Sequence, residues 1–312
     1  MGKEVEMMTK GKETANKRKD TIPLFLMTLP GILKVFLFSY VPMAGIIIAF
    51  QEYNPVDMFF SPFNGFANFA YLFRSIDFAR ILTNTVLMNV LFITVGTVVA
   101  LALALLLFEI ARTRISKVAQ ISFFIPYFVS YVVVSVIVGA FLDGTGIVTS
   151  LIYRISGERI RFYMEPKYWR WILLIVHIWK SAGVTGIIYY TCLLNVDTSL
   201  YEAASIDGAG KFRQIFVVSL PQLKSMIIVL TLMNFANILR SDFNLFFFVT
   251  QNSSALYETT DVIDTYIYRA IKQTPNFGLA SAVSLVQAVV GLALTLILNA
   301  AAKRIDENVS LF

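Results

Sequence analysis

Six long apolar runs constrain the fold of this chain more than any other feature of its sequence. A helix needs about 20 largely apolar residues to cross the roughly 30 Å hydrocarbon core of a bilayer. Runs of sufficient length lie at about Leu24–Phe50, Leu82–Phe108, Val118–Leu142, Trp171–Leu194, Gln222–Leu239 and Leu279–Ala302. We therefore predict an all-α, polytopic membrane protein with six transmembrane helices.

The composition agrees with this class. Hydrophobic residues make up 57% of the 312 residues and charged residues 15%, whereas soluble domains carry about 25% charged residues. The single cysteine, Cys192, excludes an internal disulfide, and the single histidine, His177, argues against a histidine metal site. The net charge of +6 is explained by basic residues beside membrane spans, so we predict no nucleic-acid partner and no metal site.

The N-terminal segment determines the predicted orientation. Residues 1–22 are polar and basic, and Lys17-Arg18-Lys19 stand just before the first apolar run. A signal peptide is the competing interpretation, but the run is longer than the apolar h-region of a typical signal peptide and no convincing cleavage site follows it. We expect a cytoplasmic basic tail over residues 1–22 and a transmembrane domain over residues 23–312. Six spans then place both termini on the cytoplasmic side of the membrane.

One polar-to-amphipathic segment, residues 197–221, separates the fourth and fifth apolar runs. Its first residues, Asp-Thr-Ser at 197–199, can cap a helix, and Glu202 is predicted in the first turn, where the helix dipole favours a carboxylate. Gly208 permits a sharp exit, a second short helix is predicted over about 211–219, and Pro221 suits the start of a further helix. The segment thus predicts a helix-turn-helix at the membrane surface that presents a small knob to a partner. An ordinary interfacial helix is the alternative.

These residues also carry a resemblance to a known family. Glu202-Ala203-Ala204, followed by Gly208 and then by Leu220-Pro221, resemble the EAA loop of binding-protein-dependent ABC import permeases, although Val218 stands where an isoleucine is usual. The resemblance implies that residues 197–221, the EAA-like loop, form a coupling helix that docks in a groove of a cytoplasmic ATPase subunit. The coupling residues that it implies are Tyr201, Glu202, Ala203, Ala204, Asp207, Gly208, Ala209, Phe212, Leu220 and Pro221.

Other motifs are similar to a carbohydrate-permease subgroup named for polysaccharide or lipopolysaccharide uptake, which includes alginate and rhamnogalacturonan-oligosaccharide importers. The similar stretches are 38–43, 165–169, 178–180, 252–257, 260–269 and 306–312, with departures at Ser219 and Phe248. This resemblance implies a type I ABC importer permease that moves oligosaccharides by alternating access. It also implies a second related permease, two ATPase subunits and an extracytoplasmic solute-binding protein.

No catalytic constellation is visible in the sequence. Gly208-Ala209-Gly210-Lys211 lacks the earlier glycine and the hydroxyl residue of a phosphate-binding loop. A hydrolase is disfavoured because His177 lies inside a predicted span without a nearby Ser-Asp arrangement; an intramembrane peptidase remains a formal alternative. We therefore predict no catalytic residue and no cofactor on this chain, with ATP and magnesium bound by the partner ATPase.

Polar residues inside the apolar runs are the candidates for a substrate pathway. The predicted set is Asn84, Asn89, Tyr131, Lys180, Tyr189, Asn234, Asn237, Arg240, Asp242 and Asn244. Planar polar groups and aromatic rings suit a sugar ligand, and Lys180 and Arg240 point to an acidic one. The alternative is that these groups bridge helices, each worth about 0.6 kcal/mol, with no ligand involved. Lys180 in particular can be a tie between helices.

The predicted outward connections are consistent with a membrane protein but do not define its function. The aromatic residues of 51–80 suit the lipid headgroup region, and residues 240–278 include a possible re-entrant segment at Phe243–Val249, which is too short to span. Two rival functions remain open. An ABC importer for amino acids or peptides shares the loop but not the stretch 252–269, and a membrane scaffold or channel requires neither an ATPase nor Glu202.

Overall fold

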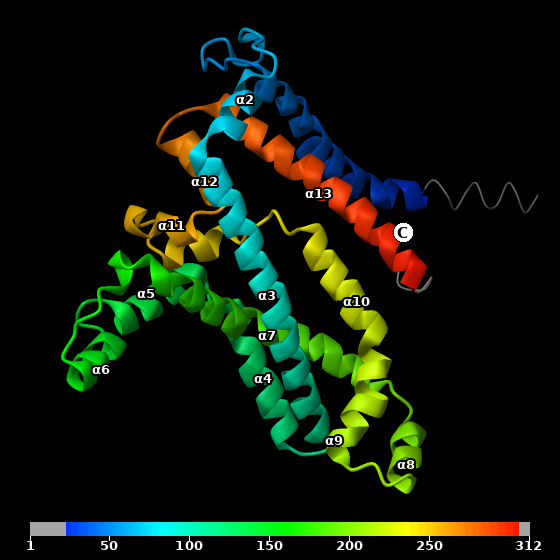
Figure 1. Ribbon diagram of the computed structural model, residues 1–312. Helices are drawn as coiled ribbons and strands as arrows, with labels where there is room; N and C mark the ends of the chain where they lie inside the picture. The colour runs from blue at the N-terminus through cyan, green and yellow to red at the C-terminus, as the bar shows by residue number, and fades with distance from the viewer. Residues whose placement is uncertain (1–22, 306–312) are drawn as a thin grey trace, which may run out of the picture.

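The computed structural model describes residues 23–305, which are largely helical (Figure 1). Within this range, six helical segments are long and apolar enough to cross a membrane: Pro23–Phe50, Ile76–Glu109, Tyr131–Ser156, Pro166–Leu194, Lys211–Ala236 and Phe277–Arg304. Among the described residues, extended backbone pairs only at an isolated bridge between Gln51 and Phe63. The prediction of an all-α protein with six transmembrane helices is confirmed. The predicted basic tail and the terminal motif at 306–312 lie outside the described residues.

Helices α3 (Ile76–Glu109) and α7 (Trp169–Leu194) form the centre of the molecule. They approach closely because small residues line their contact: a Cβ on Gly186 of α7 would lie 3.1 Å from the carbonyl oxygen of Ala100. Ala100 and Ala104 of α3 are fully buried in this contact. Small residues at such crossings let helix backbones pack tightly in a membrane.

The third predicted span is interrupted. Residues 118–142 were expected to form one helix, but α4 (Ile115–Phe128) ends before Val129 and α5 (Tyr131–Leu142) begins after Ser130. Pro126 lacks a backbone N–H, and the Ser130 hydroxyl accepts a hydrogen bond from Val133 N as the N-cap of α5. The apolar segment long enough to cross the membrane here is Tyr131–Ser156, which contains α5 and α6 (Ile147–Ser156).

The first and last spans pack side by side. Residues 23–35 are followed by η1 (Phe36–Tyr40) and η2 (Val41–Phe50), and this segment lies along α13 (Phe277–Ile305), as Figure 1 shows in blue and red. Helix α10 (Leu220–Ala236) contacts the other side of α13. Nearly all residues of the most apolar part of the first span are unburied, so most of its apolar surface is available to lipid or to another protein.

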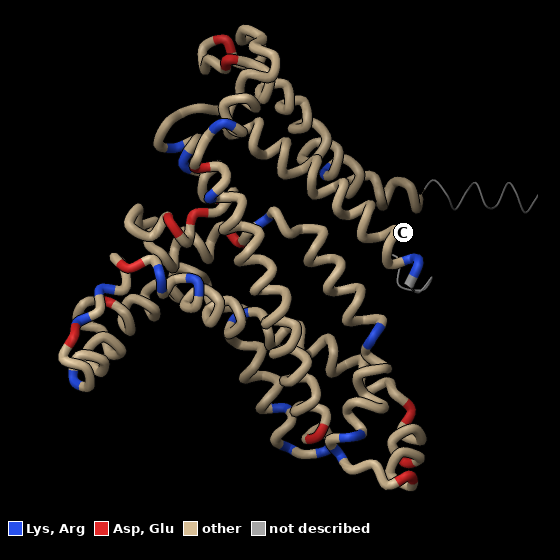
Figure 2. Tube along the Cα trace, in the orientation of Figure 1, with Lys and Arg blue, Asp and Glu red and all other residues tan. Residues whose placement is uncertain are grey.

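The two ends of the bundle are distinct. One end carries the EAA-like loop, with α8 (Thr198–Ile206) and α9 (Lys211–Gln214), and is called the loop end. The opposite or far end is formed by α2 (Ala67–Arg74), α11 (Tyr257–Thr260) and α12 (Ile263–Lys272). Figure 2 shows charged residues concentrated at these ends and in the connections, while the middle of α3 and of α13 is nearly free of them.

The expected re-entrant segment is a short helical turn. Its helix, η7 (Leu245–Val249), packs against α5 and α7. Leu245, Phe246 and Val249 are buried there in a cluster that includes Phe92 and Trp169. The run is therefore apolar because it fills the space between helices.

Candidate functional site

The first half of the EAA-like loop is a capped helix. The Asp197 side chain accepts a hydrogen bond from Ser199 N at 2.9 Å and caps α8, and this bond lowers the pKa of the Asp197 carboxyl below its ordinary value. Asp197 is therefore the N-cap of α8, and the other two predicted caps, Thr198 and Ser199, lie inside the helix. The expectation for Glu202 is wrong in detail, because α8 starts at Thr198 and its first turn holds no acidic residue. Glu202 lies in the second turn and is exposed to solvent.

The exit from α8 depends on a left-handed residue. Gly208 has a φ of +79°, Gly208 N donates to Ser205 O at 3.0 Å and Ala209 N donates to Ala204 O at 2.9 Å. A Cβ at Gly208 would meet no atom within 4 Å. Glycine is needed here for its backbone conformation and not for space.

The second half of the loop is not a separate helix. The helical path continues from α9 through η6 (Ile215–Ser219) into α10, so the span begins at Lys211 and not at Gln222 as predicted. Pro221 occupies the start of α10, directly after the wide π-type turn of η6. A proline lacks an N–H to donate to the preceding turn, and such wide turns are a common way for a helix to accommodate this loss.

Two polar contacts that were not predicted fix the angle between α8 and α9. The buried Gln214 side chain donates to Ser205 Oγ at 2.8 Å and to Ala209 O at 3.0 Å, and the hydroxyls of Tyr201 and Ser219 lie 3.0 Å apart. A glutamine on the apolar side of a short helix was the only signal for this role. These bonds make the loop one rigid unit.

The loop is also attached to the end of α3. Lys211 Nζ lies 3.2 Å from Glu109 Oε2 at the end of α3, and the rings of Phe108 and Tyr201 are 5.5 Å apart. What remains free is a surface that combines apolar side chains with carboxylates: Ile206 is 86% exposed and Phe212 is 75% exposed, beside Glu202. Exposed large apolar residues at a helix end are typical of a protein-binding surface. A hollow of about 330 Å³ next to it is lined by Ala203, Ala204, Asp207, Ala209 and Arg213.

The asparagines of α3 bind backbone carbonyls at helix ends. The Asn84 amide donates to Glu258 O at 3.0 Å and to Asp261 O at 3.2 Å. The Asn89 amide donates to Ile238 O at 2.8 Å and to Ser241 Oγ at 3.1 Å, just beyond the end of α10. Both asparagines were predicted as pathway residues, and the structure gives each an anchoring role within the chain.

Lys180 closes the break in the third span. Its ammonium donates to three carbonyls at the end of α4, Pro126 O at 3.2 Å, Tyr127 O at 3.1 Å and Val129 O. Pro126 O also accepts the backbone N–H of Val129 at 3.2 Å. An ammonium has three donors, so all are engaged. The Lys180 ammonium also lies 4.7 Å from the centre of the Tyr131 ring.

The other predicted pathway residues divide into engaged and exposed groups. The Asp242 carboxylate accepts from Asn244 N at 3.0 Å and from Leu245 N at 3.3 Å at the turn before η7, and it also interacts with the Tyr131 hydroxyl. Tyr189 is fully buried between α3 and α7. The exposed residues are Asn234, Asn237, Arg240 and Asn244, at and beyond the end of α10. A hollow of about 200 Å³ between α10 and α13 is lined by Asn237, Arg240 and Gln287, among others.

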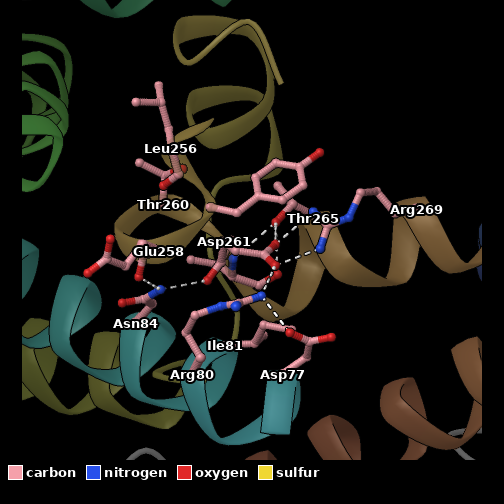
Figure 3. Close-up of polar contacts among 12 residues, drawn as sticks. Asp77, Arg80, Ile81, Asn84, Leu256, Glu258, Thr260, Asp261, Thr265 and Arg269 are labelled. Atoms are coloured by element: carbon pink, nitrogen blue, oxygen red, sulfur yellow. Dashed lines mark hydrogen bonds and ion pairs between the residues drawn. The ribbon is translucent and has the colours of Figure 1, made fainter. Parts of the chain in front are cut away.

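A polar cluster at the far end was not predicted as a site. The Asp261 carboxylate is fully buried and pairs with both terminal nitrogens of Arg269, at 2.8 and 2.6 Å, while Thr265 Oγ1 donates to it at 3.0 Å (Figure 3). Burial opposes the charge of Arg269, but the bonds and attraction from Asp261 raise the Arg269 pKa above its ordinary value. Arg80 of α3 lies 3.7 Å from Asp261. The sequence signal was available, since Asp261 and Arg269 stand two helical turns apart in a polar stretch.

Comparison with known proteins decides the family. Residues 20–310 match the family described as the binding-protein-dependent transport system inner membrane component. This chain belongs to that family.

Relatives and solved structures agree with this assignment. The permease is 36% identical over 288 residues to the polygalacturonan/rhamnogalacturonan transport system permease protein YteP of Bacillus subtilis, covering 91% of this chain and 89% of the relative. It is 28% identical over 274 residues to the lactose transport system permease protein LacF of Rhizobium radiobacter, covering 86% of this chain and 90% of the relative. A chain of the bacterial alginate ABC transporter, solved with an alginate pentasaccharide-bound periplasmic protein, superposes with a TM-score of 0.84 at 32% identity, covering 93% of the permease and 97% of that chain. The permease therefore has the ABC importer permease fold.

Proposed function

We propose that this permease is the transmembrane subunit of an ATP-driven importer that moves acidic oligosaccharides across the bacterial cytoplasmic membrane. The observation that carries the proposal is the rigid EAA-like loop, which presents Glu202, Ile206 and Phe212 to solvent while α3 holds it from behind. A surface that is both exposed and firmly attached to a membrane-spanning helix can pass the movement of an ATPase to the transmembrane domain.

The proposal assigns a role to each part of that surface. Ile206 and Phe212 fill the ATPase groove, and Glu202 pairs with a basic group of the ATPase. Ala203 and Ala204 allow close approach, and Gly208 makes the turn after α8. The remaining predicted residues support this contact: Tyr201, Asp207, Ala209, Leu220 and Pro221.

The partners follow from the same assignment. The loop end lies in the cytoplasm with both termini, and a pair of ATPase subunits binds ATP and magnesium there. A second, related permease covers part of the apolar surface of the first span, which is almost entirely exposed in the single chain. An extracytoplasmic solute-binding protein delivers the substrate at the far end, and transport proceeds by alternating access.

The acidic substrate class is supported from two sides. The uronic acid-rich polysaccharides named for the relatives, polygalacturonan/rhamnogalacturonan and alginate, are acidic. In this chain, the exposed Arg240 lines a hollow together with Asn237 and Gln287. Arg240 supplies a cation for a carboxylated sugar, while the amides of Asn237 and Gln287 hold Met233 O and Leu239 O. Lys180 does not contribute to this site in the proposal, because its three donors are occupied by carbonyls.

Uptake into proteoliposomes tests the substrate. The permease is reconstituted with its partner permease, ATPase and binding protein, and uptake of a labelled trigalacturonide is compared with that of a neutral trisaccharide. We expect ATP-dependent uptake of the trigalacturonide alone. Equal uptake of the neutral sugar would show that the acidic specificity is wrong, and uptake without ATP would refute the importer itself.

A pair of variants tests the coupling surface. Replacing a carboxylate that pairs with a basic group by arginine removes a charge-assisted bond and adds repulsion, so Glu202→Arg should lower ATP-driven uptake by about tenfold or more. Glu158→Arg, which changes another exposed carboxylate beyond α6, is the matched control and should leave uptake unchanged. Equal uptake by the two variants would show that Glu202 does not contribute to the ATPase contact.

A further inference from the structure

Helix α3 contacts functionally different segments at its two ends. It runs without interruption from Ile76 to Glu109, which is about 50 Å at 1.5 Å per residue. This length exceeds the roughly 30 Å hydrocarbon core, so both ends of α3 reach beyond the apolar layer. One end meets the polar cluster around Asp261, and the other end meets the EAA-like loop.

The far end of α3 holds the α11–α12 segment, residues 257–272, through several independent bonds. Asn84 donates to the carbonyls of Glu258 and Asp261, and Thr85 Oγ1 accepts the backbone N–H of Ile263 at 3.0 Å. Figure 3 shows Arg80 of α3 between two carboxylates, Asp77 of the same helix at 2.7 Å and Asp261 at 3.7 Å. The last residues of α11 and the first of α12 are thereby fixed to one turn of α3.

The cluster is also tied to α7. Arg170 at the start of α7 donates to Asn84 Oδ1 at 3.2 Å, and Thr259 Oγ1 donates to Pro166 O at 2.8 Å. The start of α7 therefore moves with the start of α3. Along their length the two helices pack through Gly186, Ala100 and Ala104, with no space for independent sliding.

The loop end of this pair holds the EAA-like loop. Glu109 of α3 pairs with Lys211, Phe108 packs on Tyr201, and α7 leads directly into α8 through residues 195–197. The α3–α7 pair is thus a packed connection between residues 257–272 and residues 197–221. Coupling between distant sites travels through such contiguous rigid elements when both sites bias their position.

We propose that Arg80, Thr85 and Asp261 are positioning residues through which the far-end segment 257–272 acts on the ATPase-coupling loop, with the α3–α7 pair as the rigid connection. This inference rests on the proposed function. Binding protein at the far end shifts segment 257–272, the shift is carried by α3 and α7, and the EAA-like loop changes its pose in the ATPase groove. Because coupling between two sites is reciprocal, closure of the ATPase also alters segment 257–272.

The test cuts the link to α3 and leaves the buried Asp261–Arg269 pair intact. The variant Thr85→Val/Arg80→Gln removes the acceptor for Ile263 N and the ion pair to Asp261. Asp261→Ala is avoided, since it leaves Arg269 uncompensated and the protein can fail to fold. The control is Thr94→Val/Arg74→Gln: Thr94 also donates to a carbonyl one turn back on α3, and Arg74 is exposed at the end of α2.

The first readout is ATP hydrolysis by the full complex as binding protein loaded with trigalacturonide is titrated in. We expect basal hydrolysis and assembly to be unchanged and maximal stimulation to fall at least about threefold, the size expected for the loss of one hydrogen bond and one ion pair. The half-saturating concentration should stay the same. A raised half-saturating concentration with full maximal stimulation would show that the cluster only forms a docking surface, and no change in either would also overturn the inference.

The second readout does not depend on the transported solute. Hydrogen exchange of residues 257–272 is measured in the complex without nucleotide and after trapping with ATP, magnesium and vanadate. We expect trapping to change exchange in the wild type and the control but not in the Thr85→Val/Arg80→Gln variant. Equal responses in all three would refute the inference. If the loaded binding protein did not stimulate ATP hydrolysis in the wild type, the proposed substrate would be wrong. The hydrogen-exchange measurement would still decide the role of the cluster.

Discussion

Replacing Lys180 by methionine tests whether this intramembrane charge is structural. Methionine keeps most of the apolar stem and removes the three hydrogen bonds to Pro126 O, Tyr127 O and Val129 O. Pro126 O keeps its hydrogen bond from Val129 N, so Tyr127 O and Val129 O are the carbonyls that depend on the lysine. A carbonyl left without a partner costs about 1–3 kcal/mol, so two cost about 2–6 kcal/mol. Removing a lysine from a span offsets this by about 2.5–3.5 kcal/mol. The net expectation is a loss of about 1 kcal/mol.

The assay is thermal unfolding of the detergent-solubilised complex, with uptake measured per folded transporter. A loss of about 1 kcal/mol lowers the midpoint by about 2–4 °C, since the shift is about 2–4 °C per kcal/mol for domains of about 200 residues. Lys180→Arg should fall between the wild type and Lys180→Met, because a planar guanidinium reaches fewer of the three convergent carbonyls. The concentration dependence of uptake should be unchanged in both.

Lys224→Met is the matched control. Lys224 also lies on a spanning helix, α10, but its side chain is exposed, so its loss should change stability by less than about 0.5 kcal/mol. If Lys180→Met were as stable as Lys224→Met, the helix-capping role of Lys180 would be refuted. If instead it lost affinity for the transported sugar at full stability, Lys180 would belong to the substrate pathway.

Three further predictions use other local features. Gly208→Ala should destabilise the EAA-like loop by about 1–2 kcal/mol, because φ is +79° there, whereas Gly210→Ala, also with open space around its Cβ, should be tolerated; limited proteolysis of the loop distinguishes them. Gly183→Ala should prevent normal assembly, because its Cβ would lie 1.8 Å from a carbonyl oxygen of α4, while Gly96→Ala meets no atom within 4 Å and should assemble normally in size-exclusion chromatography. Burial raises the pKa of the Asp264 carboxyl, so the ionised carboxylate destabilises the folded state. This destabilisation is absent below the ordinary pKa of an aspartate, and it grows as the pH rises from that value through the folded-state pKa. The midpoint of thermal unfolding of Asp264→Asn should therefore rise relative to that of the wild type between acidic and neutral pH. A difference between the two midpoints that does not change with pH would contradict this reasoning.

The apolar runs predicted the spans well because bilayer thickness sets their length. The break at Val129–Ser130 was hidden for the same reason: hydropathy averages over Pro126 and does not register that a lysine from another helix satisfies the freed carbonyls. The start of the fifth span at Lys211 was missed because glycine and proline mark possible ends, while the actual path depends on the Gln214 bonds. Local signals located the EAA-like loop, and contacts distant in sequence fixed its shape.

Contacts distant in sequence also reduce the number of candidate residues for the substrate pathway. Polar residues in the apolar runs were candidates because each costs free energy in a membrane unless something binds it. The structure shows that Asn84, Asn89, Lys180 and Asp242 are bound by groups of this chain at helix ends and breaks. Their presence is therefore explained without a ligand. Asn234, Asn237, Arg240 and Asn244 keep exposed side chains on or just beyond α10, so they are where a sugar contact should be sought first.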